Sequence, residues 1–376
     1  MRIVLFFLMC ILVSSCDLRR TPQPEKYAAG FKIIKSVDRT RVYKPGTNAS
    51  DNLHYRPLDI DIWYPAVRSR TDTALRVRDL LGLLEQRANY YTATDVGTGI
   101  TRQLANYFAE GFHCADSSTL LDFKTGSLRN AAAVQTKFPL VIYLCAYNGM
   151  SYENYRLFET LASEGMIVMS ISSIGRFPGD MTMKADDLLE QVLDAQRAVD
   201  VMKQDPHVDS RRIGIIGYSW GGMAAPFLAH RLENVKCIVS LEGSEFHHYG
   251  NVAEEDADFE NIRKSKEFQN LLISMPYLRL ESAPARDPTK DSIYHFTQKL
   301  AGESMIYTVD SVKHEDFGAM SLVTREAGNC AGNRQHQTVI DLTTAFLQQE
   351  LQQKPSFKEI LSRELNHRIR NKQTPY

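Results

Sequence analysis

Apolar residues along the chain follow two patterns that alternate with each other. Continuous apolar runs, typical of strands buried on both faces of a parallel sheet, lie at 138–145, 166–172, 213–217, 235–241, 277–280 and 304–309. Segments with an apolar residue every three or four positions, the period of an amphipathic helix, lie at 155–164, 186–203, 223–231 and 338–351. Buried strands that alternate with such helices predict an α/β fold with a mostly parallel, doubly wound sheet.

The flanking segments are less regular. Residues 31–37 and 58–64 alternate apolar and polar side chains, which predicts two antiparallel strands at a sheet edge. Residues 74–113 have a helical pattern that interrupts the strands, and a second insertion lies at about 244–270. These insertions could form a lid or a pocket wall, or their apolar faces could belong to the core. Together the segments predict one domain over 30–352, followed by a helical, basic tail at 353–376.

The first residues are typical of an export signal. A positively charged start precedes an apolar run at 3–13, which is too short to span a membrane. The run ends in Val13-Ser-Ser-Cys16, which resembles the lipidation motif of bacterial lipoproteins. That resemblance implies loss of residues 1–15, a lipid on Cys16, a tether over 16–29, and attachment to a membrane of the bacterial cell envelope, on its periplasmic or outer-membrane face. The alternative is an ordinary secretory signal with a Cys at this place by chance.

Composition narrows the class of protein. With 43% hydrophobic and 24% charged residues, the chain of 376 residues is an ordinary globular protein and not a disordered or fibrous one. A net charge of −1 lacks the basic excess of nucleic-acid-binding proteins, so no nucleic-acid partner is expected. The six Cys form no metal-binding spacing, so we expect no metal and no organic cofactor. Cys145 and Cys237 lie in predicted buried strands, whereas a disulfide between Cys114 and Cys330 remains open.

One turn carries a candidate nucleophile. The sequence Gly217-Tyr-Ser-Trp-Gly-Gly222 lies between a predicted buried strand and a helix, where the G-x-S-x-G nucleophile elbow is found. The turn is too tight for side chains at Gly217 and Gly221. It would lift the Ser219 hydroxyl above the sheet at a helix N-terminus, where the backbone N–H of Trp220 could stabilise an oxyanion. The alternative is a turn of small residues that merely packs a helix on a strand.

A nucleophilic serine needs a base and an acid that orients the base. His314 follows the last predicted strand. In proteins with this nucleophile elbow, the serine, the acid and the histidine follow one another in that order along the chain. Glu242 comes directly after the strand that follows the elbow and is the favoured acid. Asp287 and Glu281 follow the next strand and are the alternatives. A structural role for Glu242, as a buried and hydrogen-bonded carboxylate, is also open.

A second oxyanion donor should come from the loop after the strand 138–145. This loop reads Cys145-Ala-Tyr-Asn-Gly149, and the backbone N–H of Tyr147 is the candidate, with that of Ala146 as the alternative. The donor would be a main-chain group, so the side chains here say little about it.

Several segments in this order resemble the α/β-hydrolase superfamily. Within it, the chain is most similar to the platelet-activating-factor acetylhydrolase group and its bacterial dienelactone-hydrolase-like relatives. The similar segments, which include an ending Trp63-Tyr-Pro-Ala66 after the early strand pair, are 56–66, 138–143, 161–168, 209–222 and His314 with Phe317. The resemblance implies Ser219 as the nucleophile, His314 as the base and Glu242 as the acid.

Two positions depart from that group. Its acid is usually Asp where this chain has Glu242, and its oxyanion loop usually carries His-Gly where this chain has Cys145-Ala146. We therefore expect a serine hydrolase that cleaves carboxylic esters of a small molecule or lipid, with short acyl chains, through an acyl-enzyme. A lipase or polyesterase with a lid is one alternative. The other is a non-catalytic surface lipoprotein that binds a glycan or a protein partner.

Overall fold

The computed structural model describes residues 26–92, 99–246, 253–283, 296–330, 334–365 and 368–371. The predicted signal peptide 1–15, Cys16 and most of the tether lie outside the described residues, and so does Asp287. None of the described helices is both long enough and apolar enough to cross a membrane.

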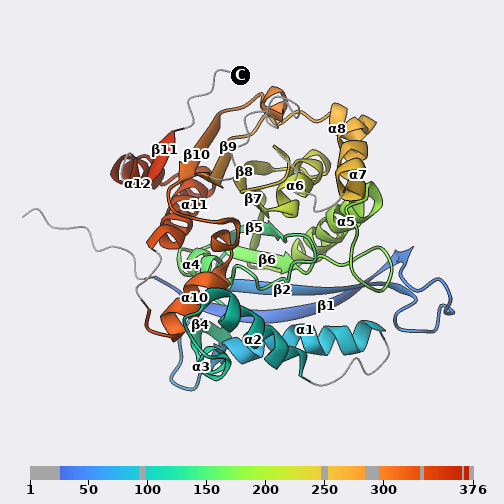
Figure 1. The fold of residues 1–376 in the computed structure, drawn as a ribbon, viewed down its shortest axis with the longest axis horizontal. Helices are drawn as coiled ribbons and strands as arrows, with labels where there is room; N and C mark the ends of the chain where they lie inside the picture. The colour runs from blue at the N-terminus through green and yellow to red at the C-terminus, as the bar shows by residue number, and fades with distance from the viewer. Residues whose placement is uncertain are drawn as a thin grey trace, which may run out of the picture.

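A single mixed sheet runs through the molecule (Figure 1). Its 11 strands follow the order β11-β10-β9-β8-β7-β5-β6-β2-β1-β4-β3. The parallel middle consists of β5 (Phe138–Leu144), β6 (Ile167–Ile171), β7 (Val208–Tyr218), β8 (Val235–Leu241), β9 (Tyr277–Ser282) and β10 (Ser304–Val309). These are the six buried strands that the apolar runs predict. The α/β fold with a mostly parallel, doubly wound sheet is therefore confirmed.

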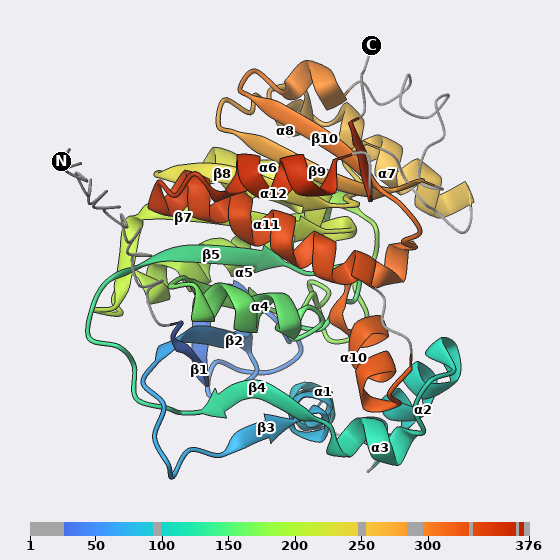
Figure 2. The same cartoon turned by 90° about the vertical axis from the view of Figure 1, so that its left-hand side faces the viewer.

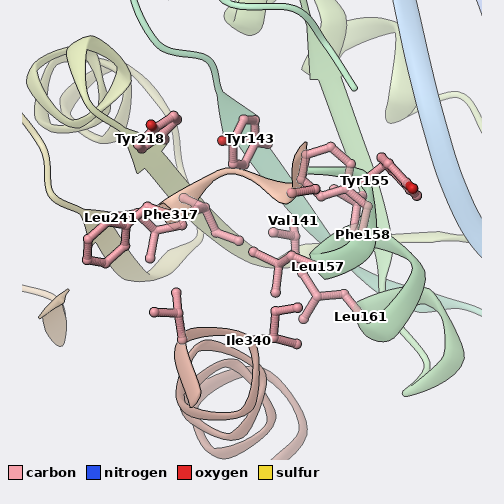
Figure 3. Packing of buried hydrophobic residues seen from close by; sticks show 14 of the residues in the cluster. Val141, Tyr143, Tyr155, Leu157, Phe158, Leu161, Tyr218, Leu241, Phe317 and Ile340 are labelled. Atoms are coloured by element: carbon pink, nitrogen blue, oxygen red, sulfur yellow. The ribbon is translucent and has the colours of Figure 1, made fainter. Parts of the chain in front are cut away.

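Helices cover both faces of this sheet, and successive strand residues supply the two cores. On one face, Val141 and Tyr143 of β5 pack with α4 (Tyr155–Ser163) and α11 (Arg334–Gln352), as the buried side chains of Figure 3 show. On the other face lie α5 (Ala185–Met202) and α6 (Trp220–Arg231), which contribute to the second core cluster. Figure 2 shows α4 and α11 in front of the sheet and α5 behind it. The four predicted helices are thus confirmed, with small shifts at their ends.

The first two strands pair as predicted, but they do not form the edge. β1 (Ala28–Val42) runs antiparallel to β2 (Tyr55–Ala66). β2 also pairs with β6, while β1 pairs with β4 (Lys124–Arg129), and β4 with β3 (Ala74–Arg76). The prediction of a sheet edge was wrong because β4 has the sequence Lys-Thr-Gly-Ser-Leu-Arg, which carries no apolar run to reveal it.

The insertion 74–113 contributes to the core. After β3 it forms α1 (Val77–Thr92) and α2 (Ile100–Phe112), which are followed by α3 (Ser117–Asp122). Its buried apolar residues that join the main core cluster are Leu75, Val77, Leu80, Leu81, Leu83 and Ala105. Of the two alternatives that the sequence leaves open for this insertion, these buried residues favour a core element.

A disulfide connects this insertion to a distant part of the chain. Cys114, between α2 and α3, is bonded to Cys330, which follows α10 (Ala319–Ala327). The bond closes a separation of 216 residues, and α10 also packs on α2 and α3 (Figure 1). The pairing that the sequence leaves open is therefore present in the structure.

The last two segments also contain regular structure. The second insertion forms α7 (Ala253–Lys264) and the short α8 (Lys266–Gln269). In the predicted tail, α12 (Ser356–Glu364) is the expected helix, and β11 (Ile369–Asn371) pairs antiparallel with β10. Part of the tail therefore extends the sheet, which the basic composition of this segment does not indicate.

Candidate active site

The candidate nucleophile lies in a strained turn between β7 and α6. Ser219 has φ 53° and ψ −117°, a conformation that is uncommon for a residue with a side chain. Its N–H donates to the Leu241 carbonyl at 3.1 Å, and its own carbonyl accepts from the N–H groups of Gly222 (2.9 Å) and Ser244 (2.8 Å). Because strand β8 and the start of α6 both bind this residue, the surrounding backbone holds the strain.

Glycine is required on both sides of the serine. A Cβ atom at Gly221 would lie 2.0 Å from the Leu144 carbonyl oxygen, and one at Gly217 would lie 2.4 Å from the Gly221 carbonyl oxygen. Both contacts are with backbone, which cannot turn aside as a flexible side chain can. The backbone of this turn therefore leaves no room for a side chain at Gly217 or Gly221, as the motif predicts.

His314 reaches the serine from the other end of the site. It begins a short 3₁₀ helix, His314–Phe317, after β10, and its Nε2 lies 3.0 Å from Ser219 Oγ. Its ring stacks on Tyr218 with a centroid distance of 5.3 Å, and the Tyr218 hydroxyl donates to the His314 carbonyl at 2.9 Å. Tyr218 thus orients the imidazole by both ring and hydroxyl, while 41% of the His314 side chain remains exposed toward solvent.

Glu242 lies behind the imidazole. Its Oε2 is 3.3 Å from His314 Nδ1, while its Oε1 accepts a hydrogen bond of 2.5 Å from the Ser282 hydroxyl. The residue has φ 46°, and its N–H donates to the Leu280 carbonyl at 2.8 Å. The carboxylate is buried, so its charge is held near the imidazole with little screening by water.

The other acid candidates are not brought to His314 in this way. Glu281 is buried, but its carboxylate accepts from Arg279 Nε at 2.8 Å, and that guanidinium also pairs with Glu245. Asp287 falls outside the described residues. Of the described candidates, Glu242 is therefore the carboxylate that the structure brings to the imidazole.

The two candidate oxyanion donors of the loop after β5 differ in whether their backbone N–H is already hydrogen-bonded. The Ala146 N–H donates to Glu153 Oε1 at 2.9 Å, so this alternative donor is already bound. Within the part of the chain that the structure describes, no acceptor binds the Tyr147 N–H. The Tyr147 ring lies 6.3 Å from that of Trp220, the first residue of α6, whose N–H precedes the helical hydrogen-bond pattern. The two predicted donors thus come from adjacent segments.

Sequence reasoning did not identify two residues of this site. Ser282 gives no signal, because its contact with Glu242 depends on how β8 and β9 pair. Glu153 stands before a predicted helix, where an acidic residue is ordinary. The fold instead turns it toward the loop after β5, where burial raises its pKa to about 7. Among the described residues, no group of three or more His, Cys, Asp or Glu is arranged to hold a metal ion.

Known proteins were compared with the chain and its structure. A family model described as the C-terminal domain of BAAT/acyl-CoA thioester hydrolase matches residues 195–316, a segment that contains Ser219, Glu242 and His314. A solved structure, ferulic acid esterase from Streptomyces cinnamoneus, matches with a TM-score of 0.63 at 18% sequence identity, over 92% of this chain and 97% of that one. The chain has the α/β-hydrolase fold. A search of curated proteins finds no match.

This fold explains why the site lies where it does. In an α/β-hydrolase the catalytic groups occupy the carboxyl ends of the parallel strands, where the elbow and the later loops meet. Ser219, Glu242 and His314 follow β7, β8 and β10, so each stands just beyond such a strand end.

Proposed function

We propose that this protein is a serine hydrolase that cleaves carboxylic ester bonds through an acyl-enzyme. The observation that carries the proposal is the line of contacts at the elbow. Ser219 Oγ is 3.0 Å from His314 Nε2, and His314 Nδ1 is 3.3 Å from Glu242 Oε2. The two comparisons support it, because one describes a thioester hydrolase domain and the other names an esterase.

In the proposed mechanism, Ser219 attacks the ester carbonyl carbon while His314 Nε2 accepts the hydroxyl proton. Glu242 stabilises the imidazolium that forms, and the N–H groups of Trp220 and Tyr147 bind the oxyanion of the tetrahedral intermediate. The imidazolium then protonates the leaving alcohol as the C–O bond breaks, which leaves the acyl group on Ser219. His314 next deprotonates a water molecule, which attacks the acyl-enzyme and releases the acid and the free serine.

The longer acid side chain is compatible with this role. Glu has one methylene more than the Asp of similar enzymes, so its carboxylate needs a different approach to the imidazole. The left-handed backbone of Glu242 and the hydrogen bond from Ser282 support that approach, because one sets the direction of the side chain and the other fixes one carboxylate oxygen.

The substrate and the location are further parts of the proposal. We infer a small-molecule or lipid ester with a short acyl chain, as the resemblance to acetylhydrolases implies, and lipid attachment through Cys16 in the bacterial cell envelope. The disulfide between Cys114 and Cys330 supports an exported protein, because such bonds persist in oxidising compartments.

The test is a series of p-nitrophenyl esters from acetate to palmitate, together with acetyl-CoA, on protein without residues 1–16 and on Ser219→Ala. We expect turnover of the short esters and a loss of at least about a thousandfold in the variant. A fluorophosphonate should label the wild-type protein and not Ser219→Ala.

Other outcomes would change the proposal in defined ways. A preference for long acyl chains would indicate a lipase in place of an acetylhydrolase-like esterase. A preference for acetyl-CoA would favour thioester hydrolysis, the reaction that the description of the matching family model names. No turnover together with no labelling would contradict an enzymatic role and favour a binding protein.

A further inference from the structure

A single acidic residue connects two parts of the candidate site that come from different regions of the chain. Glu153 precedes α4, and its Oε1 accepts two hydrogen bonds, from the Ala146 N–H at 2.9 Å and from the Tyr143 hydroxyl at 3.0 Å. Tyr143 lies in β5 and Ala146 lies in the loop after it. The carboxylate therefore binds this loop to the strand from which the loop emerges.

The backbone around Glu153 binds the histidine turn. The Glu153 carbonyl accepts from the Ala319 N–H at 2.8 Å, at the start of α10. The side-chain amide of the next residue, Asn154, donates to the Phe317 carbonyl at 2.9 Å. Residues 153 and 154 thus contact the loop 145–149 on one side and the segment just after His314 on the other.

The loop itself is closed around this carboxylate. The Gly149 N–H donates to the Ala146 carbonyl at 2.8 Å, and a Cβ atom at Gly149 would lie 2.5 Å from Glu153 Oε2. Glycine at this position leaves the room that the carboxylate occupies. The spatial fit and the two hydrogen bonds together hold the backbone of the loop.

No ion pair neutralises Glu153 among the described residues. The titratable groups that face it are the side chains of Tyr143, Cys145, Tyr152 and Tyr218, whose pKa values are all raised, mainly by burial. A carboxyl group in such surroundings is costly to ionise. A leucine could fill the same space without that cost, but it could not accept the Ala146 N–H.

We propose that Glu153 is a positioning residue that holds the loop 145–149 so that the Tyr147 N–H faces the Ser219 hydroxyl. This inference rests on the proposed function, because it deepens the role of that loop as an oxyanion donor. By occupying the Ala146 N–H, Glu153 leaves the next amide of the loop as the one available to a substrate oxygen.

The kinetic test compares Glu153→Ala with Glu153→Gln. The alanine variant removes the acceptor, and we expect kcat for p-nitrophenyl acetate to fall roughly ten- to hundredfold with KM changed less than about threefold. The glutamine variant keeps an oxygen that can accept both hydrogen bonds, so it should restore kcat to within about threefold of wild type.

Glu159→Ala is the matched control. Glu159 is a buried glutamate close by in α4, but its partners are Ser127 and Arg156, away from the loop 145–149. Its loss should lower stability and leave kcat unchanged. An unchanged kcat in Glu153→Ala, or an equal loss in both alanine variants, would overturn the positioning role.

Amide hydrogen exchange tests the positioning without relying on activity. Peptides that cover 145–149 and 314–319 should exchange faster in Glu153→Ala and not in Glu159→Ala. Unchanged exchange in both segments would refute the inference even if the enzyme is active. Faster exchange in a protein that turns over no ester would support the structural link and contradict the proposed function alone.

Discussion

Two residues at the centre of the site have backbone conformations that are unusual for their type. Ser219 and Glu242 both have positive φ angles, 53° and 46°, and such conformations each cost on the order of 1–3 kcal/mol. Backbone hydrogen bonds to Leu241 and Leu280 hold them in place. The strained backbone therefore lowers the stability of the fold at two positions. These are the ends of β7 and β8, from which the side chains of Ser219 and Glu242 approach His314.

Replacing Glu242 by Gln tests the acid at this scale. The variant keeps the size and the hydrogen bond with Ser282 but removes the charge that would stabilise the imidazolium. We expect kcat/KM for p-nitrophenyl acetate to fall by roughly a thousand- to ten-thousandfold, while thermal unfolding changes little. A loss below about tenfold would indicate that another carboxylate orients His314, and Glu281→Gln would then be measured in the same assay.

Glu153 should make stability depend on pH. Burial raises its pKa from 4.5 to about 7, so between these values the folded state holds a proton that the unfolded state has lost. The free energy of unfolding should therefore fall as the pH rises through this window. We expect a fall of about 1–3 kcal/mol, which is less than the full pKa shift corresponds to, because part of the Glu153 side chain contacts solvent. Urea unfolding from about pH 5 to about pH 8 should show a flatter profile for Glu153→Gln. Identical slopes would contradict the assignment.

The residues of the site were not equally predictable. Ser219 could be named because its motif requires a strand, a turn and a helix that are local in the chain. Chain order indicated His314, and the position directly after the strand that follows the elbow favoured Glu242 over Asp287 and Glu281. Their catalytic role stays a prediction, although the structure brings the three side chains together. Ser282 could not be named, because its contact with Glu242 joins two segments that are 40 residues apart in sequence. Glu153 is only seven residues from Ala146, but no pattern in the sequence shows that its side chain turns back toward that loop.

At the scale of elements, helix α1 shows how a polar pattern can mislead. Asp59 and Asp61 give β2 the alternation of a strand with one solvated face. In the structure Arg87 of α1 lies over that face, with ion pairs of 3.1 Å to Asp59 and 2.5 Å to Asp61, and it donates to the Ser151 hydroxyl at 2.8 Å. The polar residues of β2 therefore mark a buried ion-pair cluster, which the period of the sequence cannot distinguish from an exposed surface.

Arg87→Met should separate these two interpretations. It would leave Asp61, which is fully buried, without its cation, and breaking a buried pair in this way costs about 3–5 kcal/mol. Arg78 in the same helix is a matched control, because its pair with Asp122 is exposed and Arg78→Met should cost at most about 1 kcal/mol. Chemical unfolding measures both, and equal small losses would mean that α1 does not depend on this cluster.

At the scale of the whole molecule, the order of buried strands and helices was enough to predict the fold. A parallel strand in the middle of a sheet needs apolar side chains on both faces, so β5 to β10 are visible in the sequence as continuous runs. The elements β3, β4 and β11 are short or polar and join the sheet through backbone hydrogen bonds. Backbone pairing does not depend on side-chain type, so the hydrophobic pattern of the sequence did not predict these three strands.

The first described residue and the candidate nucleophile lie at opposite ends of the parallel strands. Lys26 lies beside Lys137, Gly165 and Arg212, near the amino ends of β5, β6 and β7. Ser219 lies beyond the opposite end of β7, seven residues after Arg212, which corresponds to roughly 23 Å at about 3.3 Å per residue. The proposed tether would therefore join the domain at the end of the sheet opposite the candidate nucleophile Ser219. If the protein is attached to a membrane through Cys16 as proposed, we expect it to cleave esters dissolved in the aqueous phase faster than lipids that remain in the anchoring leaflet.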